Sequence, residues 1–306
     1  MPAHAKQPMP EVPGVEHIYL NAGGLRMHVA TAGPEGGEPI MLLHGWPQHW
    51  WLWRNVIPVL ADAGYRVYAP DLRGLGWTEA TPRYRDYDKR QFARDIVALL
   101  DVLELHEPIK LVGHDWGGWT GFVVAMTHPE RVERYLAMNI PPPWLDPRPF
   151  NLGRAAKATS RLWYQVVMAT PGLNWAAQVG PAKSVFEDGI VKGSVRREVW
   201  GDGVLDVFLD QFEDADHRRS SKFIYRRFLL TELPQIQAGK YLDGKLTVKT
   251  HLLFGRGDQA IDPDVIDADH SRHADDLTIE FVEDCGHFIV DEQPETVAAT
   301  ALKFFA

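Results

Sequence analysis

Short β-rich runs alternate with longer helical stretches, and this alternation most narrows what the chain can fold into. The runs typical of strands lie at 17–20, 26–31, 40–44, 65–70, 109–113 and 134–140. Between them, the stretch 88–103 has Phe92, Ile96 and Leu99 at helical spacing behind Asp88, a residue type that caps helix starts. This order predicts an α/β fold with a mostly parallel central sheet flanked by helices on both faces.

A proline-rich stretch interrupts the alternation. Prolines at 141, 142, 143, 147 and 149 exclude both a helix and an inner strand there. The chain is then helical to about Pro234, and strand character resumes at 246–254 and 277–283. We therefore predict a core formed by residues 1–140 and 241–306. Residues 141–240 form an inserted helical cap, a lid over the strand ends, where such sheets bind ligands.

Composition and net charge limit the kinds of partner and location that we expect for this protein. The 306 residues include 41 Asp and Glu against 32 Lys and Arg, a net charge of -9, so we expect no nucleic-acid partner. One cysteine allows neither an intrachain disulfide nor a thiolate metal cage. Without an export-signal core or a long apolar run, we expect a cytoplasmic protein with no membrane span. A homodimer is left open.

The strongest chemical signal is the run GHDWGG at 113–118, between an apolar strand and a helix expected to reach His128. Such a strand, turn and helix are typical of a nucleophile elbow, which holds its central side chain at the top of the strand. Glycines at 117, 118 and 121 let the helix approach the sheet closely. The alternative, a phosphate-binding turn, lacks both GxGxxG and a Lys-Ser/Thr ending. The central residue is Asp115.

An aspartate at this position selects the reaction class. A carboxylate attacks a saturated carbon, displaces a leaving group and forms an alkyl ester, so acyl substrates are disfavoured. Next to a helix N-terminus, Asp115 is expected to be ionised at neutral pH without help from a base. A base is needed later, for the water that cleaves the ester.

Residues after the last two predicted strands supply a base and its orienting acid. Among 13 histidines, His287 stands in EDCGHF before the final helix and is our candidate for the base. Asp258, in FGRGDQAIDP, is the candidate acid that orients the imidazole. Asp262 precedes a proline and is typical of a helix cap, and Asp284 is a weaker rival.

Two backbone groups are candidates for an oxyanion hole. Trp46 follows the strand 41–43 in HGWP, and its N–H is expected to point at the same place as that of Trp116. The His- and Asp-bearing stretch 262–276 lacks metal-ligand spacing and is interpreted as a solvated helix face. We therefore predict neither a metal nor an organic cofactor.

The runs HGWP, DLRGLG at 71–76, GHDWGG, GRGD and GHF, in this order, resemble the α/β-hydrolase fold. Within that fold, GHDWGG is similar to the soluble, bacterial type of epoxide hydrolase. The similarity extends over nearly all of the chain beyond roughly its first 15 residues and is looser in the lid. The resemblance implies conversion of apolar epoxides to vicinal diols through a hydroxyalkyl ester on Asp115.

The resemblance also implies two lid tyrosines that donate hydrogen bonds to the epoxide oxygen. Tyr164 in LWYQ and Tyr225 in FIYRRF match that pattern, whereas Tyr135 and Tyr241 fit less well. With them, Trp46 and Trp116 complete the predicted substrate contacts, and water is the second reactant.

Two other functions stay open at this point. A haloalkane dehalogenase uses the same nucleophile, and the Trp116 indole could hold halide. Its second donor is often an Asn where Trp46 stands, unless a lid residue such as Trp175 replaces it. Fluoroacetate dehalogenases have Arg where Trp116 and Trp119 stand, so carboxylate substrates lose support. A ligand receptor on the same fold would not need Asp115, His287 and Asp258 together.

Overall fold

The computed structural model describes residues 8–144, 163–266 and 269–306. Its centre is an eight-stranded sheet of order β1-β2-β4-β3-β5-β6-β7-β8, in which β2 is antiparallel to both neighbours and the other pairs are parallel. The predicted mostly parallel sheet is confirmed. The strands are β1 (Glu16–Ala22), β2 (Leu25–Ala32), β3 (Glu38–Leu43), β4 (Tyr65–Pro70), β5 (Ile109–His114), β6 (Val132–Met138), β7 (Lys249–Gly255) and β8 (Leu277–Val282).

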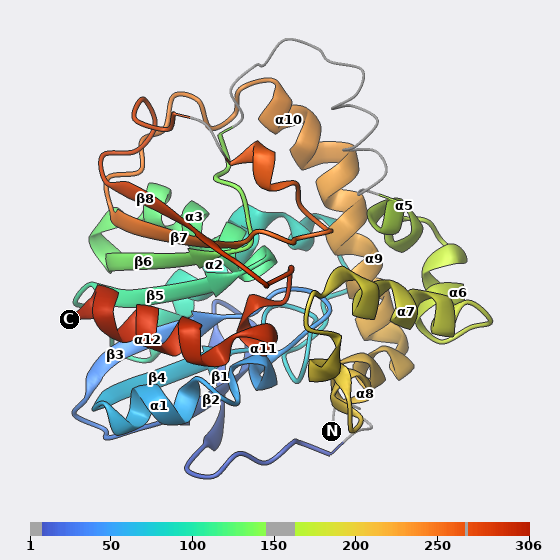
Figure 1. Ribbon diagram of the computed structural model, residues 1–306, viewed down its shortest axis with the longest axis horizontal. Coiled ribbons are helices and arrows are strands. Elements are labelled where there is room, and N and C mark those ends of the chain that lie inside the picture. Colours follow the sequence, from blue (N-terminus) through green and yellow to red (C-terminus); the bar gives the residue numbers. More distant parts are fainter. Residues whose placement is uncertain (1–7, 145–162, 267–268) are drawn as a thin grey trace.

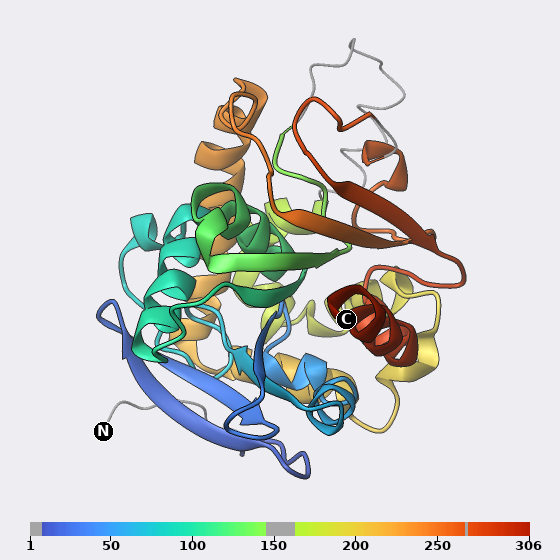
Figure 2. The same ribbon diagram turned by 90° about the vertical axis from the view of Figure 1, so that its left-hand side faces the viewer.

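Helices cover both faces of the sheet (Figures 1 and 2). One face carries α1 (Ile57–Asp62) and α12 (Pro294–Phe305), and the other carries α2 (Lys89–Val102) and α3 (Trp116–Thr127). The expected cap of α2 is present, because the Asp88 carboxylate accepts a hydrogen bond from the Arg90 N–H. All six residues of β5 and the last four of β6 are buried, as expected of inner strands covered on both faces.

A helical layer stands beyond one end of the strands, at the right of Figure 1. It lies between β6 and β7 in sequence, and its described residues include no strand. This is the inserted cap of the predicted fold, whereas its bounds, 141 and 240, stay a prediction. Its elements are α5 (Trp163–Ala169), α6 (Leu173–Gln178), α7 (Lys183–Gly193), α8 (Val204–Leu209), α9 (Ala215–Arg227), a π-helical turn (Phe228–Glu232) and α10 (Leu233–Gln237).

Buried charges tie the cap to the core at the start of α2. The Lys89 ammonium lies 3.0 Å from the Glu232 carboxylate, which also accepts from the Lys89 backbone N–H at 2.8 Å. Both side chains are buried, and a buried charge without a partner would be strongly destabilising, so each charge compensates the other. Nearby, Arg227 pairs with Asp88 at 3.2 Å. These contacts fix the end of α9 against the core.

The stretch 262–276 differs from the predicted solvated helix face. Over the parts that the structure describes, 262–266 and 269–276, the only helical element is a short 3-10 turn, Pro263–Val265. His273 is 2% exposed and stacks on Trp144. His270 accepts a hydrogen bond from the Trp144 indole at 3.1 Å. The partner is remote in sequence, which is why local periodicity could not reveal this packing. No cluster of three potential metal ligands occurs among the residues described above.

Every helix in the described ranges is too short or too polar to cross a membrane.

Candidate active site

Asp115 stands at a strained turn between β5 and α3. Its φ of 50° and ψ of -123° are rare for any residue other than glycine, while its carbonyl accepts the first α3 hydrogen bond, from Trp119. The turn is possible because neighbouring positions lack side chains. A Cβ on Gly117 would lie 2.2 Å from the Leu43 carbonyl oxygen, and one on Gly45 would lie 2.4 Å from the Asp115 Cβ. The predicted elbow geometry is present.

The Asp115 carboxylate is buried but supported by donors. The Trp46 N–H donates to its Oδ1 at 2.9 Å, and the nearby Trp116 N–H helps to lower its pKa. Burial by itself would raise the pKa of Asp115, but the hydrogen bond and charge of His287 outweigh it, so the pKa lies below its usual value. Asp115 is therefore an anion stabilised by the Trp46 and Trp116 N–H groups and by His287.

His287 bridges two carboxylates. Its Nδ1 lies 2.8 Å from the Asp258 Oδ2, and its Nε2 lies 3.6 Å from the Asp115 Oδ2. Burial lowers the pKa of His287, but the charges of Asp258 and Asp115 outweigh burial and raise the pKa to about 10. The imidazole is thus protonated at neutral pH while Asp115 is ionised.

Asp258, rather than its sequence neighbours, is the partner of His287. Its Oδ1 accepts from the backbone N–H groups of Ala260 and Ile261 at 2.7 and 2.8 Å, which leaves Oδ2 aimed at the imidazole. Asp262 instead caps the 3-10 turn, and Asp284 is exposed.

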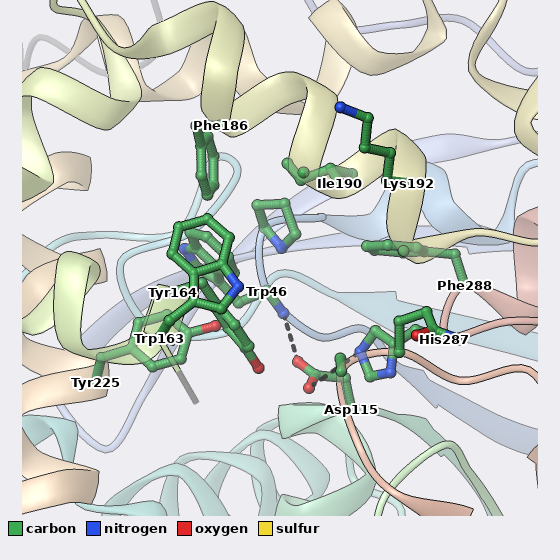
Figure 3. A pocket seen from close by; sticks show the side chains of 15 residues that line it. Trp46, Asp115, Trp163, Tyr164, Phe186, Ile190, Lys192, Tyr225, His287 and Phe288 are labelled. Carbon is green, nitrogen blue, oxygen red and sulfur yellow. Dashed lines mark hydrogen bonds and ion pairs between the residues drawn. The ribbon is translucent and has the colours of Figure 1, made fainter. Parts of the chain in front are cut away.

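Two phenols lie across Asp115 from His287 (Figure 3). Tyr164 comes from α5 and Tyr225 from α9, and their rings are 5.7 Å apart and nearly perpendicular. Burial raises the pKa of both, so each is a neutral donor. The other tyrosines lie elsewhere: Tyr135 donates to the Gly118 carbonyl, and Tyr241 packs near Trp119.

These groups share one cavity of about 580 Å³ beneath the cap. Asp115, His287, Tyr164 and Tyr225 line its floor and sides (Figure 3). The rest of the wall is largely apolar and includes Trp46, Pro47, Trp163, Phe186, Ile190 and Phe288. Such a wall suits a small apolar ligand with one polar reacting group.

The indoles differ in their surroundings. Trp46 lines the cavity, but its Nε1 donates to the Ser221 hydroxyl at 2.7 Å. Trp116 packs on Tyr225 and under the Lys89 ammonium, is absent from the cavity lining, and its Nε1 has no hydrogen-bond partner among described residues. Trp175 is 52% exposed and does not line the cavity, so the suggestion that it supplies a second halide donor is wrong.

Sequence reasoning missed Asn139. It follows β6 with a φ of 45°, and its amide donates to the Asp258 carboxylate at 2.8 Å and to the Gly286 carbonyl at 3.1 Å. The available signal was a polar Asn at the end of the predicted strand 134–140, just before the prolines, because polar residues at strand ends face the ligand side of such sheets.

Comparisons with known proteins agree with this geometry. Residues 38–169 match the alpha/beta hydrolase fold family. Soluble epoxide hydrolase of Corynebacterium sp. strain C12 is 31% identical, over 95% of this chain and 98% of that protein. The AB hydrolase superfamily protein YfhM of Bacillus subtilis is 42% identical over 42% of this chain, but this match spans only 45% of that protein.

Solved structures give the same result. Wild-type Cfl2 from Burkholderia cenocepacia superposes with a TM-score of 0.81 at 26% identity, covering 97% of this chain and 98% of that one. A mutant Vigna radiata epoxide hydrolase gives 0.79 at 25% identity, covering 95% and 98%. The fold and the site thus define a hydrolase of the α/β-hydrolase fold. More narrowly, the chain belongs to the epoxide hydrolase family.

Proposed function

We propose that this enzyme hydrolyses apolar epoxides to vicinal diols through a covalent hydroxyalkyl ester on Asp115. The observation that carries the proposal is that one largely apolar cavity is lined by a carboxylate, an imidazole 3.6 Å from it, and two neutral phenols. This set provides a nucleophile for carbon, donors for oxygen and a base for water.

In the first half-reaction, an Asp115 oxygen attacks an epoxide carbon and the ring C–O bond breaks. The electron pair of that bond stays on the epoxide oxygen, which accepts hydrogen bonds from Tyr164 and Tyr225 and takes a proton from one of them. The phenols are buried and neutral, so they donate only as charge develops on the oxygen. The product is an ester with a neighbouring hydroxyl.

Ester formation changes the proton affinity of His287. The pKa of about 10 depends on two anions, Asp258 and Asp115, and esterification removes the charge of Asp115. The pKa of His287 then falls, and its proton restores the phenol. The neutral imidazole is the base that the second half-reaction needs.

In the second half-reaction, His287 takes a proton from water, and the hydroxide attacks the ester carbonyl carbon of Asp115. The N–H groups of Trp46 and Trp116 stabilise the resulting oxyanion, because the first donates to this carboxylate and the second favours its anionic form. Collapse releases the diol and restores the Asp115 anion beside a protonated His287. Protons therefore balance over the cycle.

A single turnover in heavy-oxygen water tests the proposal. With enzyme in excess over an aryl-substituted epoxide, we expect the first diol to carry unlabelled oxygen from the Asp115 carboxylate, since water attacks the ester carbon rather than the substrate. Later turnovers should incorporate label. Label in the first diol would contradict the ester, and halide release from chloroalkanes without diol formation from epoxides would favour a dehalogenase.

Removal of either phenol should slow ring opening. We expect Tyr164→Phe and Tyr225→Phe each to lower the alkylation rate by about 10- to 100-fold, and the double variant to abolish it nearly completely, because the alkoxide loses its donors. Rapid-quench mass spectrometry of the ester measures this rate. Tyr241→Phe, outside the cavity, is the matched control. An unchanged alkylation rate in the double variant would exclude the two tyrosines as donors to the epoxide oxygen.

The cytoplasmic location and the absence of a nucleic-acid partner stay predictions from the sequence, and a homodimer stays open.

A further inference from the structure

A third buried carboxylate lies beside the active site, and the proposed cycle does not use it. Glu292 ends the short helix α11 (Ile289–Glu292) and is 2% exposed. Its Oε2 accepts from the backbone N–H groups of Gly286, Val195 and Arg196 at 2.9, 2.9 and 3.0 Å. Its Oε1 accepts from the Phe288 N–H at 3.2 Å. One side chain thus satisfies four backbone donors.

Two of these donors flank His287. Gly286 and Phe288 precede and follow it, so Glu292 holds the base loop, residues 286–288, from both sides. Within this loop, the His287 carbonyl oxygen is hydrogen-bonded to the His114 Nε2 at 2.8 Å. The His287 ring faces Asp258 and Asp115. The loop backbone therefore determines where the imidazole Nε2 lies relative to the ester carbon.

The other two donors belong to the cap. Val195 and Arg196 follow α7, whose last residue, Gly193, lines the cavity together with Phe288. The contact is tight: a Cβ on Gly286 would lie 2.8 Å from the Gly193 carbonyl oxygen and 3.0 Å from the Val195 nitrogen. The cap segment 193–196 and the base loop meet at one carboxylate.

We propose that Glu292 is a positioning residue that fixes the base loop and the cap segment to each other, so that His287 keeps its alignment for ester hydrolysis while the cap wall is in place. This inference rests on the proposed two-step function. An amide cannot replace the carboxylate, since four N–H groups need acceptors and a glutamine offers one oxygen and a competing NH2. In either amide orientation, at least one flanking N–H faces another donor.

The test is Glu292→Gln, with alkylation and hydrolysis rates measured separately by rapid-quench mass spectrometry of the ester. We expect the hydrolysis rate to fall by at least about tenfold, the alkylation rate to stay within about threefold, and the ester to accumulate in the steady state. Attack by Asp115 does not need the base, whereas ester hydrolysis does. Glu295→Gln, an exposed glutamate three residues along, is the matched control and should leave both rates unchanged.

The outcomes separate this inference from the proposed function. Equal slowing of both steps, or a loss of thermal stability with both rates intact, would overturn the positioning role and leave the ester mechanism standing. If no ester formed in the wild type or in a variant without His287, the proposed two-step function itself, on which this inference rests, would be contradicted.

A measurement on the wild type covers the case in which Glu292→Gln does not fold. Single-amide hydrogen exchange should show the Gly286, Phe288, Val195 and Arg196 amides opening with protection factors within about threefold of each other, since one carboxylate releases all four. Protection that differs by more than about tenfold between the loop pair and the cap pair would overturn the coupling.

Discussion

Asp115→Asn is expected to lower kcat/KM for every epoxide substrate by at least about ten-thousand-fold, because an amide oxygen is a far weaker nucleophile than a carboxylate. The change preserves the shape of the side chain and the acceptor for the Trp46 N–H. Asparagine also tolerates positive φ better than most residues, so the strained elbow with its φ of 50° should survive.

Diol formation under substrate saturation and circular dichroism of the folded protein together check this expectation. Asp284→Asn is a matched control, because Asp284 also has a positive φ, 51°, but its side chain is exposed. The control should keep wild-type turnover. If folded Asp115→Asn protein retained more than about a hundredth of the wild-type rate, the elbow carboxylate would not be the nucleophile.

His287→Gln should separate the two half-reactions. Glutamine cannot take a proton from water, so we expect ester hydrolysis to slow by about a thousandfold or more, while Asp115 still opens the ring. After addition of an epoxide, the mass of the intact protein should rise by the mass of one substrate. Peptide mapping should place the added mass on Asp115.

The pH dependence of the alkylation rate in His287→Gln should change as well. Loss of the imidazolium removes a charge that lowers the pKa of Asp115, so the acidic limb of the alkylation rate should move to higher pH. The double variant Asp115→Asn, His287→Gln should form no adduct. No adduct in folded His287→Gln, or equal adduct in the double variant, would contradict a covalent step at Asp115.

Local sequence patterns were sufficient for the sheet and for the position of the nucleophile. The strand-like runs at 109–113 and 134–140 correspond to β5 and β6, because buried parallel strands are rich in apolar residues. The glycine pattern around Asp115 predicted a close approach of α3, since only a missing Cβ fits against the β3 carbonyls. Prolines predicted where the chain leaves the sheet. The prediction of a solvated helix face at 262–276 was wrong, because this stretch packs on Trp144, which is remote in sequence.

The sequence by itself determined that an aspartate occupies the elbow, that a histidine and an aspartate follow the last two strands, and that a helical segment is inserted between β6 and β7. Tertiary structure alone decided how these residues meet. It brought Asp258 and Asp115 to the two ring nitrogens of His287 and gave Asp258 a hydrogen bond from Asn139. It also exposed Trp175 and joined the cap to the base loop at Glu292. The physical reason is that residue type and spacing are encoded locally, whereas distances, burial and shared hydrogen-bond acceptors arise only when remote segments pack.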